Sequence, residues 1–475
     1  MKKRFPKWLL SALTLVISLL VFSGLVFAAE EIEDDAPGLV EAKIVTEVLD
    51  WGETVTAIRL EYSEEIRSNA IVQNNEYPGT LTYLVMGDYE IDCVYVNNTG
   101  VKDDVEPSGK YVFLNFCVGS HDWIDYRDYV TFNTTEKSRP QCEAIYFYQN
   151  EEIETVSGKT IAPSGRTRTS GEIRMGIDEF TSVQYESELL EDDVVFYYHI
   201  YIPEGYEERS DELADLPLVV HFPSGDVNYD DYSGLYYGAL LSHNDATEWV
   251  MPEAQSENPA FVLTFGCSER LSDYGEIYVE IIDSLIETYN IDTSRIYAIG
   301  LAGGGATMWD TILNHPDLFA GSISTSYEFY EVYGAEEAVS KCAELLDILP
   351  CWFFVGEDDY SGQSYDNPDD TRVKSQRLID TGRELIEEGY QIDIAYGEDG
   401  EDMWNGLLRG EKAEAQAEEQ LSRAEENGST NLITVFTANT IRQTGHWSWT
   451  AVYTNPVVRS WLFQQVNETP YRPAA

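Results

Sequence analysis

The chain has 475 residues, of which 85 are acidic and 30 are basic, so its formal net charge at pH 7 is −55. A surface this acidic repels nucleic acids and anionic lipids, and we exclude nucleic-acid binding on that ground. Apolar residues make up 43% of the sequence, which is enough for two hydrophobic cores in a chain of this length.

The first 28 residues have the pattern of a secretory signal peptide. Basic residues precede a long apolar stretch: Lys2, Lys3, Arg4 and Lys7. The stretch ends at Ala28, a small residue suited to cleavage. We expect a secreted protein that has no stable membrane association after cleavage. An uncleaved anchor is the alternative, because the apolar stretch is long enough to span a bilayer.

Residues 36–156 contain short strand-like runs, separated by turns rich in Gly, Asn, Asp and Pro. The runs cover residues 39–45, 54–62, 81–85, 91–96, 111–116 and 144–148. Short strands at this spacing predict a β-sandwich. We expect this domain to cap or orient the rest of the chain; binding a polymer through aromatic side chains is the alternative. Residues 157–176 are rich in Gly, Ser, Thr and Arg, and predict a linker.

Residues 177–470 alternate strand-like and helix-like segments, which predicts an α/β domain with a mostly parallel sheet. The expected strands cover residues 180–185, 196–201, 217–222, 261–265, 296–299, 350–355, 391–396 and 431–436. Helices are expected over residues 277–289, 306–314 and 456–466. The Glu-, Ala- and Gln-rich segment 407–427 predicts a surface helix, with a lid over the site as the alternative.

The most informative segment is Gly300-Leu-Ala-Gly-Gly304, which follows an apolar strand and precedes a helix. A strand-to-helix turn flanked by glycines is typical of the nucleophile elbow of serine hydrolases. Ala302 occupies the position of the serine. Because alanine has no lone pair, it cannot attack a carbonyl carbon. The alternative is a glycine-rich turn that only packs closely or binds a phosphate.

Two further residues follow in the order expected of a hydrolase. Asp359 comes just after the strand at 350–355, and His446 precedes the last helix. Nucleophile position, acid and then histidine is the chain order of α/β-hydrolases. A solvated acidic turn and a surface histidine are the alternatives, and Asp358 is the nearest rival for the role of the acid.

Residues 180–466 resemble secreted bacterial esterases related to feruloyl esterases and polyhydroxybutyrate depolymerases. The resemblance is carried by residues 201–206, 217–220, 258–263, 289–292, 295–305 and 446–453. More narrowly, the chain resembles two-domain esterases that place an immunoglobulin-like domain before an α/β-hydrolase domain. The resemblance implies Ser-His-Asp ester hydrolysis without a cofactor, with position 302 as nucleophile, His446 as general base and Asp359 orienting the imidazole. It also implies a small-molecule or polymer-borne ester as the ligand.

An oxyanion hole needs two backbone N–H donors. Gly303 would supply one of them. The other should come from the loop Phe222-Pro-Ser-Gly225, where the family typically has His-Gly followed by a small residue and another Gly. Because Pro223 has no N–H group, only Ser224 or Gly225 can donate there.

Ala302 has two explanations: an engineered change in an active esterase, or a natural loss that kept the fold. Pro223 in the oxyanion loop and the polar flank beginning at Tyr360 favour natural loss. The expected function is therefore that of a carboxylesterase-like hydrolase that is inactive or strongly impaired, because Ala302 occupies the nucleophile position. The alternatives are a non-catalytic protein that binds an ester, glycan or polymer, and an enzyme in which Ser224 replaces the nucleophile. We expect Trp309, Trp447 and Trp449 to line the pocket.

Six cysteines are present, three in each half of the chain. Export permits disulfides, and Cys342 with Cys351 is the pair we would test first. The cysteines lack zinc-ligand spacing, so we expect neither a structural nor a catalytic metal.

Overall fold

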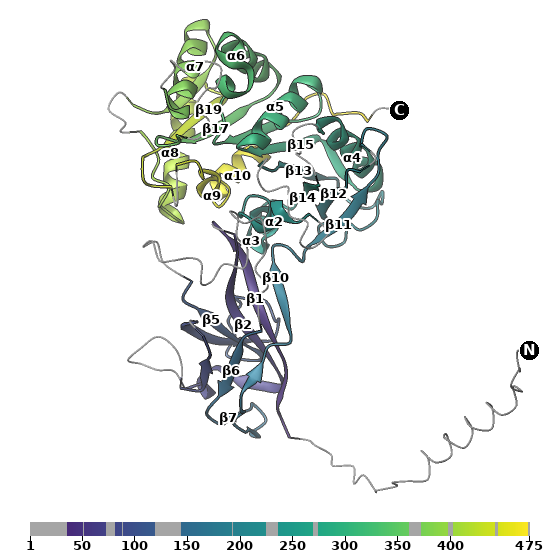
Figure 1. The fold of residues 1–475 in the computed structure, drawn as a ribbon, viewed down its shortest axis with the longest axis vertical. Coiled ribbons are helices and arrows are strands. Elements are labelled where there is room, and N and C mark those ends of the chain that lie inside the picture. Colours follow the sequence, from purple (N-terminus) through teal and green to yellow (C-terminus); the bar gives the residue numbers. More distant parts are fainter. Residues whose placement is uncertain are drawn as a thin grey trace, which may run out of the picture.

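The computed structural model describes residues 36–473, except for residues 51, 73–80, 88, 119–143, 192, 225–235, 269–273, 361–371, 398–401 and 442–444. An N-terminal β domain and a C-terminal α/β domain follow one another along the long axis of the molecule (Figure 1). The expected signal peptide lies outside the described residues. Within the described ranges, no helix is both long and apolar enough to cross a membrane.

The N-terminal domain contains a five-stranded sheet in the order β10-β1-β2-β5-β4, a three-stranded sheet β3-β6-β9 and the hairpin β7-β8. The strands are β1 Leu39–Leu49, β2 Gly52–Arg67, β3 Tyr83–Val85, β4 Ile91–Asn97, β5 Ser108–Phe116, β6 Tyr146–Gln149, β7 Ile153–Glu154, β8 Thr160–Ile161, β9 Thr167–Arg168 and β10 Gly171–Met175; a 3-10 turn covers Ser68–Ala70. The core is made of alternate residues such as Ile58, Leu60 and Phe147, as the two-residue period of a strand requires.

The expected linker over 157–176 is not a linker in the structure. It contains β8, β9 and β10, and β10 pairs in parallel with β1, with Lys43 opposite Gly171. Glycine, serine and threonine are typical of loops and also of short edge strands. Only the tertiary pairing with β1 distinguishes the two, and the local sequence does not contain it.

The C-terminal domain is built on a nine-stranded sheet in the order β11-β12-β14-β13-β15-β16-β17-β19-β18. β12 pairs antiparallel with both β11 and β14, and the other neighbours are parallel. The strands are β11 Phe180–Tyr185, β12 Phe196–Tyr201, β13 Leu216–Phe222, β14 Phe261–Cys267, β15 Ile291–Leu301, β16 Gly321–Thr325, β17 Cys351–Gly356, β18 Ile392–Ala395 and β19 Asn431–Phe436.

Helices lie on both sides of this sheet (Figure 1). They are α2 Gly238–Leu241, α3 Pro252–Glu257, α4 Gly275–Thr288, α5 Gly303–Asn314, α6 Phe329–Ile348, α7 Lys374–Glu388, α8 Glu411–Asn427, α9 Trp449–Val452 and α10 Pro456–Phe463, with a 3-10 turn at Thr247–Val250. Neighbouring residues of β13 belong to different apolar clusters, Leu218 to one and Val219 to the other. Because successive strand residues point to opposite faces, the sheet has a core on each side.

The segment around 407–427 forms a helix that flanks the sheet. Arg423 of α8 pairs with Asp393 of β18 at 2.9 Å, and the Gln420 carboxamide accepts a hydrogen bond from Thr434 Oγ1 of β19 at 2.7 Å. These contacts hold α8 against the edge of the sheet. The structure therefore favours the surface helix over a lid.

Cys342 and Cys351 do not form the disulfide that was considered. Both side chains are buried in the apolar cluster beside the sheet, and both thiols are free. The Cys351 thiol lies 3.2 Å from Ser322 Oγ, and burial raises the pKa of Cys351 to about 12. The two thiols are apolar core residues of the α/β domain.

The tip of the β1–β2 hairpin is packed into the C-terminal domain. Val48 belongs to the same apolar cluster as Trp249. Asp50 accepts a hydrogen bond from the Arg409 guanidinium at 3.0 Å. A Cβ placed on Gly52 would lie 3.0 Å from the carbonyl oxygen of Leu241, so the two backbones meet directly.

Replacing Gly52 by alanine tests this domain contact. Both Gly52 (φ 111°) and Gly158 (φ 83°) have a positive φ, but only Gly52 is crowded by another backbone. We expect Gly158→Ala to lower the free energy of unfolding by about 1 kcal/mol through backbone strain alone, and Gly52→Ala by at least about 2 kcal/mol. Denaturant unfolding of both variants measures the difference. Equal losses would contradict a tight contact between the domains.

Candidate functional site

Ala302 stands between β15 and α5 in a strained backbone conformation. Its φ is 45° and its ψ is −128°, values that are rare for residues with a side chain. Its N–H donates to the Thr325 carbonyl at 2.9 Å, and its own carbonyl accepts from Gly305 N–H at 2.9 Å. The residue as a whole is only 6% exposed. The local geometry is a strand-to-helix elbow with position 302 at its tip.

Two glycines of the elbow have no room for a side chain. A Cβ on Gly304 would lie 2.2 Å from the Phe222 carbonyl oxygen and 2.5 Å from that of Pro223. A Cβ on Gly300 would lie 3.1 Å from Gly305 Cα. The loop after β13 therefore rests directly on the elbow.

The expected oxyanion donors come from these two segments. Gly303 is the first residue of α5, where backbone N–H groups have no partner within the helix. Ser224 follows Pro223 in the adjoining loop and is buried. Gly225 lies outside the described residues. The structure thus brings Gly303 and the Ser224 loop together, and their role as an oxyanion hole stays a prediction.

Asp359 and His446 form a hydrogen-bonded pair. Asp359 Oδ2 lies 2.9 Å from His446 Nδ1; the carboxylate is fully buried, whereas the imidazole is 23% exposed. Asp359 follows β17 and His446 follows β19, so both lie near the carboxyl edge of the sheet, where β15 ends at the elbow. With Asp359 accepting from Nδ1–H, Nε2 of a neutral imidazole is left as the basic nitrogen.

Asp358 does not pair with His446 in the structure. Its carboxylate accepts a hydrogen bond from Asn439 N–H at 2.9 Å and so holds the loop after β19. A Cβ on Gly445 would lie 2.2 Å from Asp358 Oδ1, and a Cβ on Gly356 would lie 2.3 Å from the Gly445 carbonyl oxygen. The acid loop and the histidine loop are therefore in direct backbone contact.

Of the three tryptophans expected to line the pocket, Trp309 and Trp449 belong to the buried apolar clusters. Trp309 is fully buried and stacks on Phe329 with ring centroids 4.1 Å apart. Trp449 is also buried and meets the His446 ring edge-on at 5.4 Å, while Trp447 is half-buried. Trp309 belongs to the apolar cluster on one side of the sheet, whereas Ala302 belongs to the cluster on the other side.

Buried polar residues that the sequence analysis missed lie beside the histidine loop. The His243 ring packs edge-on against Trp447 (4.6 Å) and Trp449 (5.1 Å), and burial lowers the pKa of His243 to about 4. His221 bridges Thr264 at 2.7 Å and Asp245 at 3.1 Å. These residues do not belong to a recognisable sequence motif. The only feature of the sequence that could have drawn attention to them is the small number of histidines, six in the chain.

A serine pair joins the histidine loop to the centre of the sheet. Ser326 follows β16 with a φ of 57°, and its hydroxyl lies 2.6 Å from that of Ser448. Its N–H donates to the Phe354 carbonyl of β17 at 2.8 Å.

Among the described residues, no group of three or more His, Cys, Asp or Glu side chains is arranged to hold a metal ion.

Residues 41–162 match the family described as Esterase Ig-like N-terminal domain. The whole structure is similar to that of a thermostable esterase, with 22% sequence identity, 90% of this chain and 99% of that chain covered, and a TM-score of 0.64. The chain is an immunoglobulin-like domain followed by an α/β-hydrolase domain. This confirms the expected fold class and a fold of the esterase and serine hydrolase type.

The hydrolase domain also has weaker structural similarities. A feruloyl esterase module from Clostridium thermocellum is 11% identical, with 62% of this chain and 92% of that chain covered and a TM-score of 0.35. An S-formylglutathione hydrolase from Agrobacterium tumefaciens is 12% identical, with 60% and 94% covered and a TM-score of 0.32. No curated protein sequence matches the chain.

The depressed pKa of His243 predicts a loss of stability in mild acid. Below pH 6.5 this histidine becomes protonated in the unfolded chain, whereas in the folded chain it stays neutral until the pH falls to about 4. The free energy of unfolding should fall across that window by up to about 1.4 kcal/mol per pH unit through His243. We expect His243→Phe to flatten the curve by this amount in denaturant unfolding between pH 4 and 6.5. Parallel curves for parent and variant would contradict the assignment.

Proposed function

We propose that the hydrolase domain is a carboxylesterase-type domain whose reaction is blocked at one atom, the missing hydroxyl at Ala302. The observation that carries the proposal is the Asp359–His446 pair near the sheet edge at which the strained elbow presents residue 302. A histidine base oriented by a buried carboxylate is the arrangement that takes a proton from a neighbouring nucleophile. No such group is present on the alanine side chain.

With a hydroxyl at position 302 the chemistry is that of acyl transfer. His446 Nε2 would accept the hydroxyl proton as the oxygen attacks the ester carbonyl, and Asp359 would stabilise the imidazolium that forms. The N–H of Gly303 would donate to the oxyanion, together with one donor from the Ser224 loop. The alcohol would leave with the proton from His446, and water would then release the acid.

We propose natural loss rather than engineering as the origin of Ala302. Pro223 removes an N–H from the oxyanion loop, which rests on Gly304. Tyr360, directly after the acid, is 71% exposed instead of packing against the domain. A single engineered change would have left both features as they are in the family.

Hydrolysis of p-nitrophenyl acetate and butyrate by the purified chain and by Ala302→Ser tests the proposal. We expect the parent to match the buffer blank and the variant to exceed it by about 10³-fold or more, since a complete triad is worth several orders of magnitude over its parts. Asp359→Asn and His446→Ala, each added to Ala302→Ser, should remove most of the gain. Parent activity that depends on His446 would overturn the role given to position 302.

A second candidate is a binding protein that holds an ester, glycan or polymer without turning it over. The half-buried Trp447 beside His446 supports it, because an aromatic ring suits an apolar ligand group. This function is favoured if Ala302→Ser stays inactive while addition of an ester quenches the tryptophan fluorescence of the parent protein. Absence of both activity and quenching would contradict the two proposals together.

We also propose that the chain is exported, with residues 1–28 removed. The proposal is supported by the basic start, the apolar stretch and Ala28 in the sequence. Expression of the full chain in a bacterial host should give a protein in the periplasm or medium whose intact mass begins at Ala29. A deletion of residues 2–28 should stay in the cytoplasm. An intact N-terminus in a membrane fraction would instead support the uncleaved anchor.

A further inference from the structure

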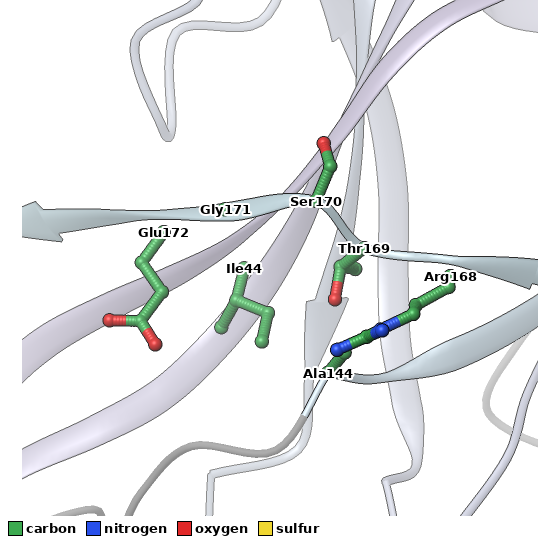
Figure 2. A pocket seen from close by; sticks show the side chains of 7 residues that line it. All are labelled: Ile44, Ala144, Arg168, Thr169, Ser170, Gly171 and Glu172. Carbon is green, nitrogen blue, oxygen red and sulfur yellow. The ribbon is translucent and has the colours of Figure 1, made fainter. Parts of the chain in front are cut away.

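A cavity of about 470 Å³ lies in the immunoglobulin-like domain, where the chain crosses from β9 to β10. Figure 2 shows the side chains of Glu172 and Arg168 at opposite ends of the residues that line it, with Ile44 between them. Charges of both signs do not select one class of ligand, so the cavity by itself identifies no function. The buried contacts around the candidate site in the hydrolase domain are more specific.

Ser326, directly after β16, has a backbone conformation that is unusual for a residue with a side chain. It is fully buried and has a φ of 57°, in the left-handed region that favours glycine. A strained residue of this kind persists only where its surroundings hold it, and such residues cluster at functional sites. Glycine would relieve the strain, so any benefit of a serine at this position must come from its hydroxyl.

Each polar group of Ser326 has a partner. Its N–H donates to the Phe354 carbonyl of β17 at 2.8 Å. Its carbonyl accepts from the buried Lys374 ammonium of α7 at 3.2 Å. Its hydroxyl lies 2.6 Å from the hydroxyl of Ser448. The two main-chain hydrogen bonds hold the strained backbone, and the hydroxyl is thereby held against Ser448.

Ser448 uses its hydroxyl for this contact and not for its own helix. It is the residue before α9, where a serine typically accepts a hydrogen bond from an N–H of the first helical turn. Its side chain makes no such capping bond. Both Ser448 and Ser326 are fully buried, so removing either hydroxyl would leave the other without this hydrogen bond. The pair therefore ties the start of α9 to the end of β16.

The end of β16 also contacts the other two segments of the candidate site. The carbonyl of Thr325 accepts from Ala302 N–H at 2.9 Å, which holds the elbow. The bond from Ser326 N–H to Phe354 reaches β17, the strand that leads into the acid loop. Two adjacent residues thus connect the elbow, the acid strand and the loop that carries the histidine.

We propose that Ser326 is a positioning residue that sets the place of His446 by holding Ser448, two residues further along the chain; this rests on the function proposed above. Because Ser326 is fully buried, it does not itself meet a substrate. A general base must lie within hydrogen-bond reach of the group that it deprotonates, and a displacement of about 1 Å can cost about 10²-fold in rate. The hydroxyl pair supplies this precision from behind the histidine loop.

Proton NMR of the parent chain with labelled histidines tests the proposal without turnover. The proton on His446 Nδ1, which faces Asp359 Oδ2 at 2.9 Å, should give a downfield signal that is assigned by its loss in His446→Ala. We expect a sharp signal in the parent. In Ser326→Ala and Ser448→Ala we expect it to broaden or vanish, because a loosened loop exposes the proton to exchange with water.

Two further variants separate positioning from stability. Ser326→Gly removes the hydroxyl but relieves the backbone strain, so its denaturant unfolding should stay close to that of the parent while the His446 signal is lost. The matched control is Ser322→Ala, which removes another buried hydroxyl of β16, one that bonds to Cys351 at 3.2 Å. The control should keep the signal. A parent without the signal, retention of the signal in Ser326→Ala and Ser448→Ala, or its loss in the control would each overturn the proposal.

Kinetics in the Ala302→Ser background provide a second readout. Adding Ser326→Ala should lower kcat for p-nitrophenyl butyrate at least about tenfold and leave KM within about twofold, since the base is displaced but the binding surface is not. An unchanged kcat would overturn the positioning role. If Ala302→Ser is itself inactive, the proposed function fails, and the NMR comparison in the parent decides the role of Ser326.

Discussion

At the carboxyl edge of the nine-stranded sheet, loops from different strands meet through main-chain atoms. Gly304 lies against the carbonyls of Phe222 and Pro223, and Gly356 lies against Gly445. These contacts fix the elbow to the loop after β13, and the acid loop to the histidine loop, without using the side chain at position 302. A hydroxyl can therefore be absent from Ala302 while the elbow keeps its strained backbone and Asp359 keeps its hydrogen bond to the histidine.

The sheet was largely predictable because several of its strands are mostly apolar and fully buried. β13, β14, β17 and β19 are covered on both faces, and their continuous apolar runs mark them in the sequence. β16 was not anticipated: its residues, Gly-Ser-Ile-Ser-Thr, are small and mostly polar, and they form a strand through pairing with β15 and β17. The same dependence on a partner explains why β8 to β10 looked like a linker.

The candidate site, like the sheet, has residues that the sequence could identify and residues that only the structure could identify. Elbow, acid and histidine stand in motifs with a fixed order, so the sequence was enough to select Ala302, His446 and the acidic turn that contains Asp359. Their catalytic roles stay predictions. The choice between Asp358 and Asp359 needed coordinates, since it depends on which carboxylate reaches Nδ1. His243 is far from His446 in sequence and becomes its neighbour only because its ring packs against Trp447 and Trp449 in the fold.

The hairpin that carries Val48 into the core of the hydrolase domain affects how the two domains behave as a unit. A hydrophobic cluster shared across a domain boundary couples the unfolding of the two domains. The immunoglobulin-like domain is therefore not expected to fold and unfold independently of the hydrolase domain. Exchanging it for a homologous domain would require complementary changes around Trp249 and Leu241. In evolution, the two parts are therefore expected to be inherited and to diverge together rather than to be shuffled as modules.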